Sequence, residues 1–169
     1  MTEKVFQEMV FCHRDSMYRF AKNLLSSEPE AQDAVQSVML KLWQQKEKLG
    51  KMGALKAYAI RAVKNECLNR IQQLQTNNRH LAIAGKMQPV MENNTRGNMR
   101  QVISKFITGL PTQQKLVILL KDIEEFETHE IAAMLDMEEP AVRTNLARAR
   151  QKVRDHLQKI ETYEQQQIR

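Results

Sequence analysis

The stretch "HEIAAMLDMEEPAVRTNLARARQKVRDHL" (residues 129–157) changes from acidic to basic at its midpoint. The segment 110–140, which contains its first part, has only Lys115 and Lys121 as cations. Against them stand these carboxylates: Asp122, Glu124, Glu125, Glu127, Glu130, Asp136, Glu138 and Glu139. The segment 141–159 has the single carboxylate Asp155 and these cations: Arg143, Arg148, Arg150, Lys152, Arg154 and Lys159. Positive charge concentrated in so short a segment favours a polyanionic partner.

The same stretch predicts a helix, a tight turn and a second helix. Thr128 suits the N-cap of the first helix, and Glu130 suits its first turn, where a negative charge interacts favourably with the helix dipole. Pro140 suits the start of the second helix, because the N–H it lacks would be unpaired there. Apolar residues at helical spacing would pack the two helices together: Ile131, Leu135, Met137, Val142, Leu146 and Val153.

At 100° per residue, the second helix separates into four faces. The inward face holds Val142, Leu146, Ala149, Val153, Leu157 and Ile160. One flank holds Arg143, Arg150 and Arg154, and the other holds Arg148, Lys152 and Lys159. Between the flanks lie Thr144, Ala147, Gln151 and Gln158. Small and hydrogen-bonding residues between two rows of cations are typical of a helix that reads the major groove of DNA. The alternative is a solvated basic surface helix, but the helix-turn-helix pattern and the charge change are independent signals for DNA.

The rest of the chain predicts an all-α protein, because its prolines and glycines fall between long stretches free of helix breakers. Helices are expected at about 6–24, 27–45 and 55–75, the second with a capping box formed by Ser27 and Glu30. An amphipathic helix near 99–107 and another after Pro111 precede the helix-turn-helix. We therefore expect a three-helix unit over residues 1–75, a flexible linker over 76–97, a four-helix unit over 98–160 and a frayed tail over 161–169.

Composition excludes several classes of protein. With 42% hydrophobic residues the chain can bury a core, and its net charge is +6. Cys12 and Cys67 lie in apolar helical patterns, which favours two buried thiols in a reducing cytoplasm over a disulfide or a metal site. No signal peptide or membrane-spanning stretch is found. No paired carboxylates, metal cluster or activated nucleophile can be assembled, so neither an enzyme nor a cofactor is expected.

Three stretches resemble bacterial RNA polymerase sigma factors of the extracytoplasmic-function class. Residues 110–157, "LPTQQKLVILLKDIEEFETHEIAAMLDMEEPAVRTNLARARQKVRDHL", are similar to that family's region four. The stretches "AQDAVQSVMLKLW" and "AYAIRAVKNECLNR" are similar to its region two. The variant "EEPAVRTNLARARQKVR" looks most like members from Bacteroidetes. The resemblance covers both halves of the chain in order, with the linker between them.

The resemblance implies a transcription initiation factor that binds core RNA polymerase and directs it to promoter DNA. Region four would read the minus-thirty-five element as duplex, and region two would melt and capture the minus-ten element. An anti-sigma factor, membrane-bound or not, is a further partner that the resemblance implies, without membrane insertion of this chain. The predicted minus-thirty-five residues are Arg143, Thr144, Ala147, Arg148, Arg150, Gln151 and Lys152.

The predicted second helix has an outward polar face with one leucine in it. Its core side holds Ala31, Val35, Val38, Met39 and Leu42, and its opposite side holds Asp33, Gln36, Ser37, Leu40 and Gln44. An outward leucine among polar groups is an anchor that a partner could cover, although one exposed leucine alone means little. The resemblance implies that this face binds the clamp coiled coil of the largest polymerase subunit. Ser37 departs from the acidic residue common in relatives.

The predicted third helix buries Ala59, Ile60, Val63, Cys67, Ile71 and Leu74 and leaves polar residues along another side. The preceding loop, "EKLGKMGALK", resembles the family's specificity loop for a flipped base. The residues predicted to bind the minus-ten element come from this loop and from the helix: Lys51, Lys56, Tyr58, Arg61, Asn65 and Asn69. Rings stack on unpaired bases, cations bind phosphates and amides read base edges. For Tyr58 a packing role is favoured over stacking, because relatives usually have a buried tryptophan there.

Two further points separate this chain from its relatives and its rivals. Its linker is basic, with Arg79, Lys86 and Arg96 against Glu92 alone. This charge argues against a linker that mimics DNA in the polymerase channel. The remaining alternatives are that the linker contacts DNA or that it is loose. The rival function is a stand-alone helix-turn-helix regulator with an N-terminal sensing or dimerisation domain. That rival predicts an enclosed apolar pocket and a dimer surface.

Overall fold

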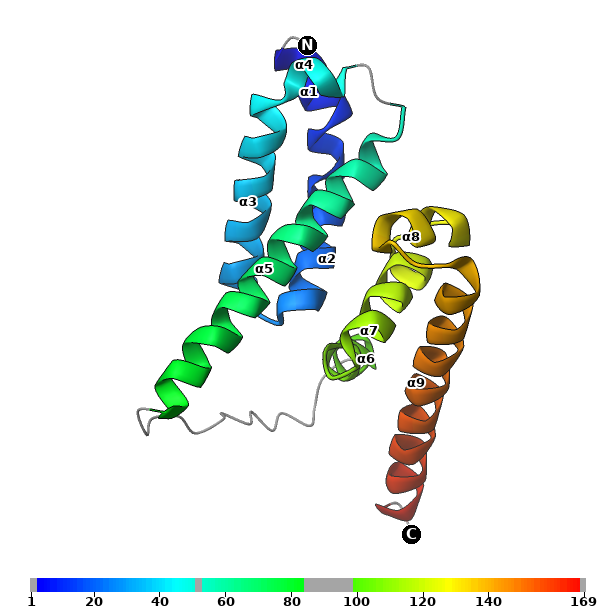
Figure 1. Cartoon of the computed structure of the whole chain (residues 1–169). Helices are drawn as coiled ribbons and strands as arrows, with labels where there is room; N and C mark the ends of the chain where they lie inside the picture. The colour runs from blue at the N-terminus through cyan, green and yellow to red at the C-terminus, as the bar shows by residue number, and fades with distance from the viewer. Residues whose placement is uncertain (1–2, 51–52, 84–98, 168–169) are drawn as a thin grey trace. The chain divides into compact units, whose positions relative to one another are not determined.

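A computed structural model describes residues 3–50, 53–83 and 99–167, and every regular element in these ranges is a helix (Figure 1). The predicted all-α class is confirmed. The chain divides into two compact units, Met1–Gly97 and Asn98–Arg169. Each unit is described by itself.

Unit 1 is built on three long helices that pack on one another. They are α2 (Arg14–Leu25), α3 (Glu28–Gln44) and α5 (Leu55–Ile83). Shorter elements accompany them: α1 (Glu3–Met9), the 3-10 turn η1 (Phe11–His13) and α4 (Lys46–Leu49). The helix expected over 6–24 is therefore interrupted at 10–13. Its apolar face continues across the break, because Phe6 and Val10 are buried along with Met17 and Phe20.

The core of unit 1 contains the apolar residues that periodicity predicts. Val38, Ile60 and Val63 are almost completely shielded from solvent, and burying such a side chain stabilises the fold by roughly 1.5–3 kcal/mol. Leu74 is an exception, since it is 48% exposed. Figure 1 shows that α5 continues past the turn between α2 and α3.

The C-terminal end of α5 also differs from the expected one. The helix was expected to end near residue 75, but it continues to Ile83. The first part of the predicted linker, 76–83, is thus helical. The remainder of that linker, with Lys86, Glu92 and Arg96, lies outside the described residues.

Half of the predicted capping box forms at the start of α3. The hydroxyl of Ser27 accepts a hydrogen bond from the backbone N–H of Glu30 at 3.5 Å. The Glu30 carboxylate pairs with Arg70 of α5 at 3.0 Å. This pairing ties the start of α3 to α5.

The described residues of unit 2 form four α-helices, as expected. They are α6 (Met99–Thr108), α7 (Thr112–Ile118), α8 (Thr128–Leu135) and α9 (Glu139–Gln167). A π-helical turn, η2 (Leu119–Ile123), continues α7. Most of the residues expected to form a frayed tail, 161–167, are the last turns of α9. The helices meet around Leu119, Leu120, Ile131, Val142 and Ala149, which are buried.

The turn between α8 and α9 positions the second helix. Glu127, and not Thr128 as expected, precedes α8 as its N-cap, and its backbone N–H donates to Oε2 of Glu130 at 2.8 Å. Asp136 ends α8 in the left-handed conformation with φ of 54°. The N–H of Met137 then bonds to the carbonyl of Ala132 at 3.0 Å, which closes the helix end.

The two cysteines differ in their surroundings. Cys67 is buried, as expected, and burial raises the pKa of its thiol to about 12. Cys12 is exposed, contrary to expectation, because it lies in η1, where the helix expected there is interrupted. Within the described ranges, no three metal-ligating side chains cluster and no helix is long and apolar enough to cross a membrane.

Candidate nucleic-acid and polymerase interfaces

The outer face of α9 presents all the predicted minus-thirty-five residues to solvent. Arg143, Thr144, Ala147, Arg148, Arg150, Gln151 and Lys152 are each exposed. On the opposite face Val142, Leu146 and Ala149 are buried against the rest of unit 2. The helical period therefore sorts the side chains of α9 as expected, and the polar middle row lies between two rows of cations.

Several of these side chains have partners within unit 2. Arg143 pairs with Glu139 one turn earlier at 3.2 Å, and the amide of Gln151 donates to Asp155 at 2.8 Å. Arg150 pairs with Asp122 of η2 through two hydrogen bonds. Arg148 and Lys152 form no ion pair within the described part of the chain. Within the described residues, the flank with Arg148 and Lys152 therefore has less of its charge compensated than the flank with Arg143 and Arg150.

The outward face of α3 is largely as expected. Leu40 is 60% exposed, and Asp33, Gln36 and Gln44 are exposed around it. Ser37 differs, because it is only half-exposed and its hydroxyl accepts a hydrogen bond from Arg70 at 3.3 Å.

Arg70 is the centre of an ionic cluster between α3 and α5. Its guanidinium pairs with Glu30 at 3.0 Å and with Glu66 at 3.2 Å. Lys41 of α3 pairs with Glu66 at 2.7 Å. The hydrogen bond from Lys41 is the main cause of a lowered pKa of Glu66, burial opposes it, and Arg70 lowers the pKa further. Sequence periodicity did not reveal this cluster, because its members come from two helices and lie up to forty residues apart.

The polar side of α5 is partly as predicted. Arg61, Asn65 and Asn69 are exposed, Lys56 is half-buried, and Lys51 lies outside the described residues. Tyr58 is half-buried, and its hydroxyl donates to the side-chain oxygen of Gln45 at 3.0 Å. The tyrosine therefore links α5 to the end of α3.

Several cations lie in or near the N-terminal half of α5. Burial and then the charge of Arg61 lower the pKa of Lys64. Burial and then the charge of Lys56 lower the pKa of His13 in η1. In both residues a neighbouring cation disfavours an additional positive charge.

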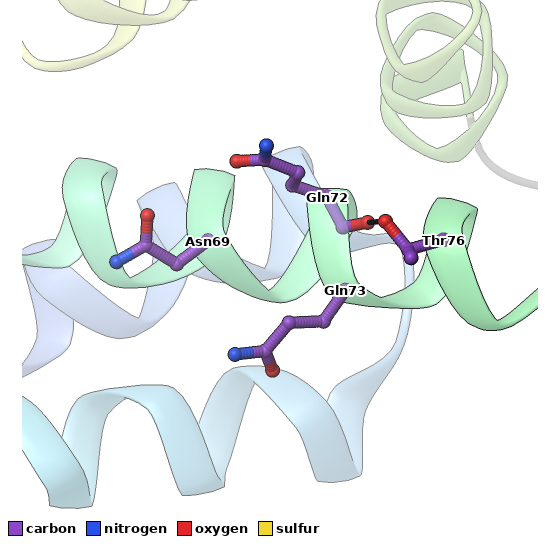
Figure 2. Close-up of a pocket in the computed structure, with 4 residues that line it drawn as sticks. All are labelled: Asn69, Gln72, Gln73 and Thr76. Atoms are coloured by element: carbon purple, nitrogen blue, oxygen red, sulfur yellow. Dashed lines mark hydrogen bonds between the residues drawn. The ribbon is translucent and has the colours of Figure 1, made fainter.

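The polar side of α5 extends further than the sequence analysis placed it. A shallow hollow of about 480 Å³ is lined by Asn69, Gln72, Gln73 and Thr76 (Figure 2). The Thr76 hydroxyl donates to the carbonyl of Gln72 at 2.9 Å. At 100° per residue, Gln72 and Thr76 share the side of Asn65 and Asn69. Thr76 was missed because the helix was expected to end at residue 75.

Comparison with known proteins identifies the family. The model of Sigma-70 region 2 matches residues 9–76, and that of Sigma-70 region 4 matches residues 100–153. The ECF RNA polymerase sigma factor SigM of Mycobacterium tuberculosis is 23% identical over 145 residues, which cover 86% of this chain and 73% of the relative. The chain belongs to the extracytoplasmic-function sigma factors.

Solved structures share the fold of this sigma factor. The sigma factor RpoE from Bartonella quintana, in complex with the anti-sigma factor NepR, matches with a TM-score of 0.75 and 21% identity, covering 92% of this chain and 98% of that one. CnrH, in complex with the cytosolic domain of CnrY, matches with a TM-score of 0.66 and 20% identity, covering 93% of this chain and 90% of that one.

The family settles the general function. This sigma factor is a transcription initiation factor that directs core RNA polymerase to promoter DNA, and it is not an enzyme. The stand-alone regulator is not favoured. The likeness to members from Bacteroidetes stays a prediction, and so do the individual contact residues.

Proposed function

We propose that unit 2 of this sigma factor reads the minus-thirty-five element as duplex through α9. The observation that carries the proposal is the outer face of α9, where Thr144, Ala147 and Gln151 lie exposed between two rows of cations. A major groove admits one α-helix, with short polar side chains at the base edges and cations at the two phosphate walls. Within the described part of the chain, Arg148 and Lys152 pair with no carboxylate that they would have to leave before binding DNA.

Unit 1 has the second DNA-binding role, the melting and capture of the minus-ten element. Asn65 and Asn69 expose amides that suit the edges of unpaired bases, and Arg61 exposes a cation for phosphate. Lys51 and Lys56 would add phosphate contacts from the start of the helix. Tyr58 has a packing role in this proposal, because its hydroxyl is bonded to Gln45.

The outward face of α3 binds core polymerase in this proposal. Leu40 is the apolar anchor, and Asp33, Gln36 and Gln44 surround it. Exposed apolar side chains within a polar rim are the usual composition of such an interface.

Location and a further partner follow from the same role. Because core polymerase is in the cytoplasm, we place this sigma factor there. An anti-sigma factor is its proposed second partner, since the two solved structures described above are complexes, of RpoE with NepR and of CnrH with the cytosolic domain of CnrY.

Core polymerase is needed for promoter specificity because the two DNA-binding faces are on separate units. The minus-thirty-five and minus-ten elements lie about twenty base pairs apart, or on the order of 70 Å at 3.4 Å per pair. The minus-ten bases are also paired in free duplex, which hides the edges that Asn65 would contact. Polymerase would fix the spacing and allow the duplex to open.

A gel-shift titration tests this division of roles. A promoter fragment, selected from randomised duplexes with the wild-type holoenzyme, is titrated with the sigma factor alone and with core polymerase at one salt concentration. We expect weak binding alone and specific binding with polymerase. In the holoenzyme, Arg148→Ala should cost about 1–3 kcal/mol at one base position if the arginine reads a base, whereas Lys159→Ala should weaken all sequences alike. Tight, specific binding by the chain alone would contradict the proposal.

A further inference from the structure

Arg150 of α9 is held by a carboxylate from another element of unit 2. Its Nε donates to Oδ2 of Asp122 at 3.0 Å, and its Nη2 donates to Oδ1 at 2.5 Å. Asp122 lies in η2, 28 positions earlier in the chain. Two parallel hydrogen bonds fix the plane of a guanidinium as well as its position.

The pairing leaves one edge of the guanidinium unused. Arginine has five N–H donors in a rigid fork, and Asp122 takes Nε–H and one N–H of Nη2. The two N–H groups of Nη1 and the other of Nη2 lie on the side away from the carboxylate. The side chains are 48% exposed for Arg150 and 33% for Asp122, so the pair is partly accessible to solvent.

The position of Arg150 on α9 suits a phosphate better than a base. On the helical wheel it lies between the buried row of Val142 and Ala149 and the outward row of Thr144 and Gln151. If the outward row enters the major groove, a side chain on this flank lies toward one of the two phosphate backbones that border the groove. The outward edge of a guanidinium matches the oxygens of a phosphate.

The other paired arginine of α9 is bound differently. Arg143 donates to a single oxygen of Glu139, at 3.2 and 3.4 Å, from within the same helix. That pair is 61% and 43% exposed, and such i,i+4 surface pairs are weak. Among the cations of α9 whose side chains are described, Arg150 is the one fixed by two hydrogen bonds to another element.

We propose that Asp122 is a positioning residue for promoter binding, which holds Arg150 so that the free edge of its guanidinium binds a backbone phosphate beside the minus-thirty-five element. The inference rests on the proposed role of α9. Because the arginine is already ordered, binding does not have to restrict its side chain. Loss of Asp122 therefore weakens promoter binding, although it removes a negative charge from a DNA-binding unit.

Other roles of Asp122 predict different effects of its removal on DNA affinity. A carboxylate that only competes with phosphate for Arg150 would weaken DNA binding, and its removal would tighten binding to any duplex. A carboxylate that only braces α9 against η2 would affect stability, and its effect on DNA would not depend on Arg150.

The test compares Asp122→Asn with the matched control Asp136→Asn. Both changes remove one negative charge from unit 2, and asparagine tolerates the left-handed backbone of residue 136. Holoenzymes are titrated on the selected promoter fragment and on an unrelated duplex. We expect Asp122→Asn to weaken promoter binding by about three- to tenfold, the effect of releasing one ordered side chain. The control should not weaken it. Tighter binding of both duplexes by Asp122→Asn than by the control would overturn the proposal.

A double-mutant cycle separates positioning from bracing. In an Arg150→Ala background, Asp122→Asn should cause no further loss, whereas in an Arg154→Ala background the loss should remain. Arg150→Ala should also reduce the slope of log affinity against log salt by about one. A loss that persists without Arg150 would overturn the proposal.

Failure of this inference is distinguishable from failure of the proposed function. If Arg150→Ala leaves affinity and salt slope unchanged while Arg148→Ala weakens binding, the positioning role is wrong and the role of α9 stands. If neither change weakens binding, the proposed minus-thirty-five role of α9 is itself wrong.

Discussion

Arg70 of α5 donates a hydrogen bond to the hydroxyl of Ser37 on α3, with 3.3 Å between the two atoms. Ser37 lies in the middle of the row that the sequence predicts for polymerase binding, and this bond turns it toward the neighbouring helix. The residues of that row left facing solvent are Asp33, Gln36, Leu40 and Gln44. The proposed polymerase face therefore depends chiefly on Leu40 and the polar groups around it.

Leu40→Lys should weaken binding of core polymerase at least about fivefold, as expected when an apolar interface anchor is lost. Its melting temperature should hardly change, because the side chain is already 60% exposed in the free protein. Titration of labelled sigma factor with core polymerase measures the first quantity, and thermal unfolding measures the second.

The matched control is Leu74→Lys, which makes the same change at a leucine that is 48% exposed on α5. The control should keep polymerase affinity. A large drop in melting temperature for Leu40→Lys, or an equal loss of affinity in both variants, would show that Leu40 is not an interface anchor.

Glu66→Gln should lower the free energy of unfolding of unit 1 by about 1 kcal/mol at neutral pH, because Lys41 and Arg70 lose a charged partner. The pKa of Glu66 is lowered in the folded state, so the stability it contributes is complete above the ordinary glutamate pKa. That stability is lost as the pH falls through the lowered pKa. Urea unfolding followed by Trp43, the single tryptophan, reports on unit 1.

The difference between wild type and Glu66→Gln should therefore shrink as the buffer is taken from neutral pH to below the lowered pKa. Glu8→Gln, at an exposed glutamate of α1, serves as the control and should unfold like the wild type at every pH. A difference for Glu66→Gln that stays constant down to strongly acidic pH would contradict the assignment.

Sequence periodicity predicted the helices and their faces, but not the ends of those faces. Most residues of the inward rows of α3 and α9 are buried as predicted, because a 3.6-residue period fixes which side chains share a side. Met39, Val153, Leu157 and Ile160 are only half-buried. Leu74 is on the inward row of α5 and is nevertheless exposed. Burial requires an inward position and also another element that packs against that part of the helix. The pair of Arg150 and Asp122 was likewise inaccessible to sequence reasoning, because it depends on how η2 packs beside α9.

Glu125→Gly should raise the free energy of unfolding of unit 2 by about 0.5–1 kcal/mol. Glu125 has φ of 61°, a left-handed conformation that costs a residue with a Cβ atom more than it costs glycine. Nothing in the local sequence marks this position, since glutamate is not a residue that favours positive φ. Hydrogen exchange of amides in α7 and α8 measures the change within unit 2.

Glu125→Ala separates the backbone effect from the charge. It removes the same carboxylate but keeps the Cβ atom, so we expect no gain in protection. Equal gains in both variants would show that relief of acidic repulsion, and not backbone strain, is responsible.

Asn65→Ala should slow opening of the promoter while leaving polymerase affinity and minus-thirty-five recognition intact. Asn65 is exposed on the polar side of α5, where an amide has no role in the core of unit 1 and is available to unpaired bases. The loss of one base contact is expected to cost about 1–3 kcal/mol, or roughly a five- to 150-fold slower formation of the open complex. Stopped-flow fluorescence with a dye in the minus-ten element measures the rate.

Gln75→Ala, also exposed on α5 but outside the row of Asn65 and Asn69, is the control and should open the promoter at the wild-type rate. On a promoter whose minus-ten element is already melted, the rate of opening by Asn65→Ala should be closer to that of the wild type. The variant should still bind the unpaired DNA less tightly than the wild type does. Normal opening of the fully paired promoter by Asn65→Ala would remove Asn65 from the minus-ten interface.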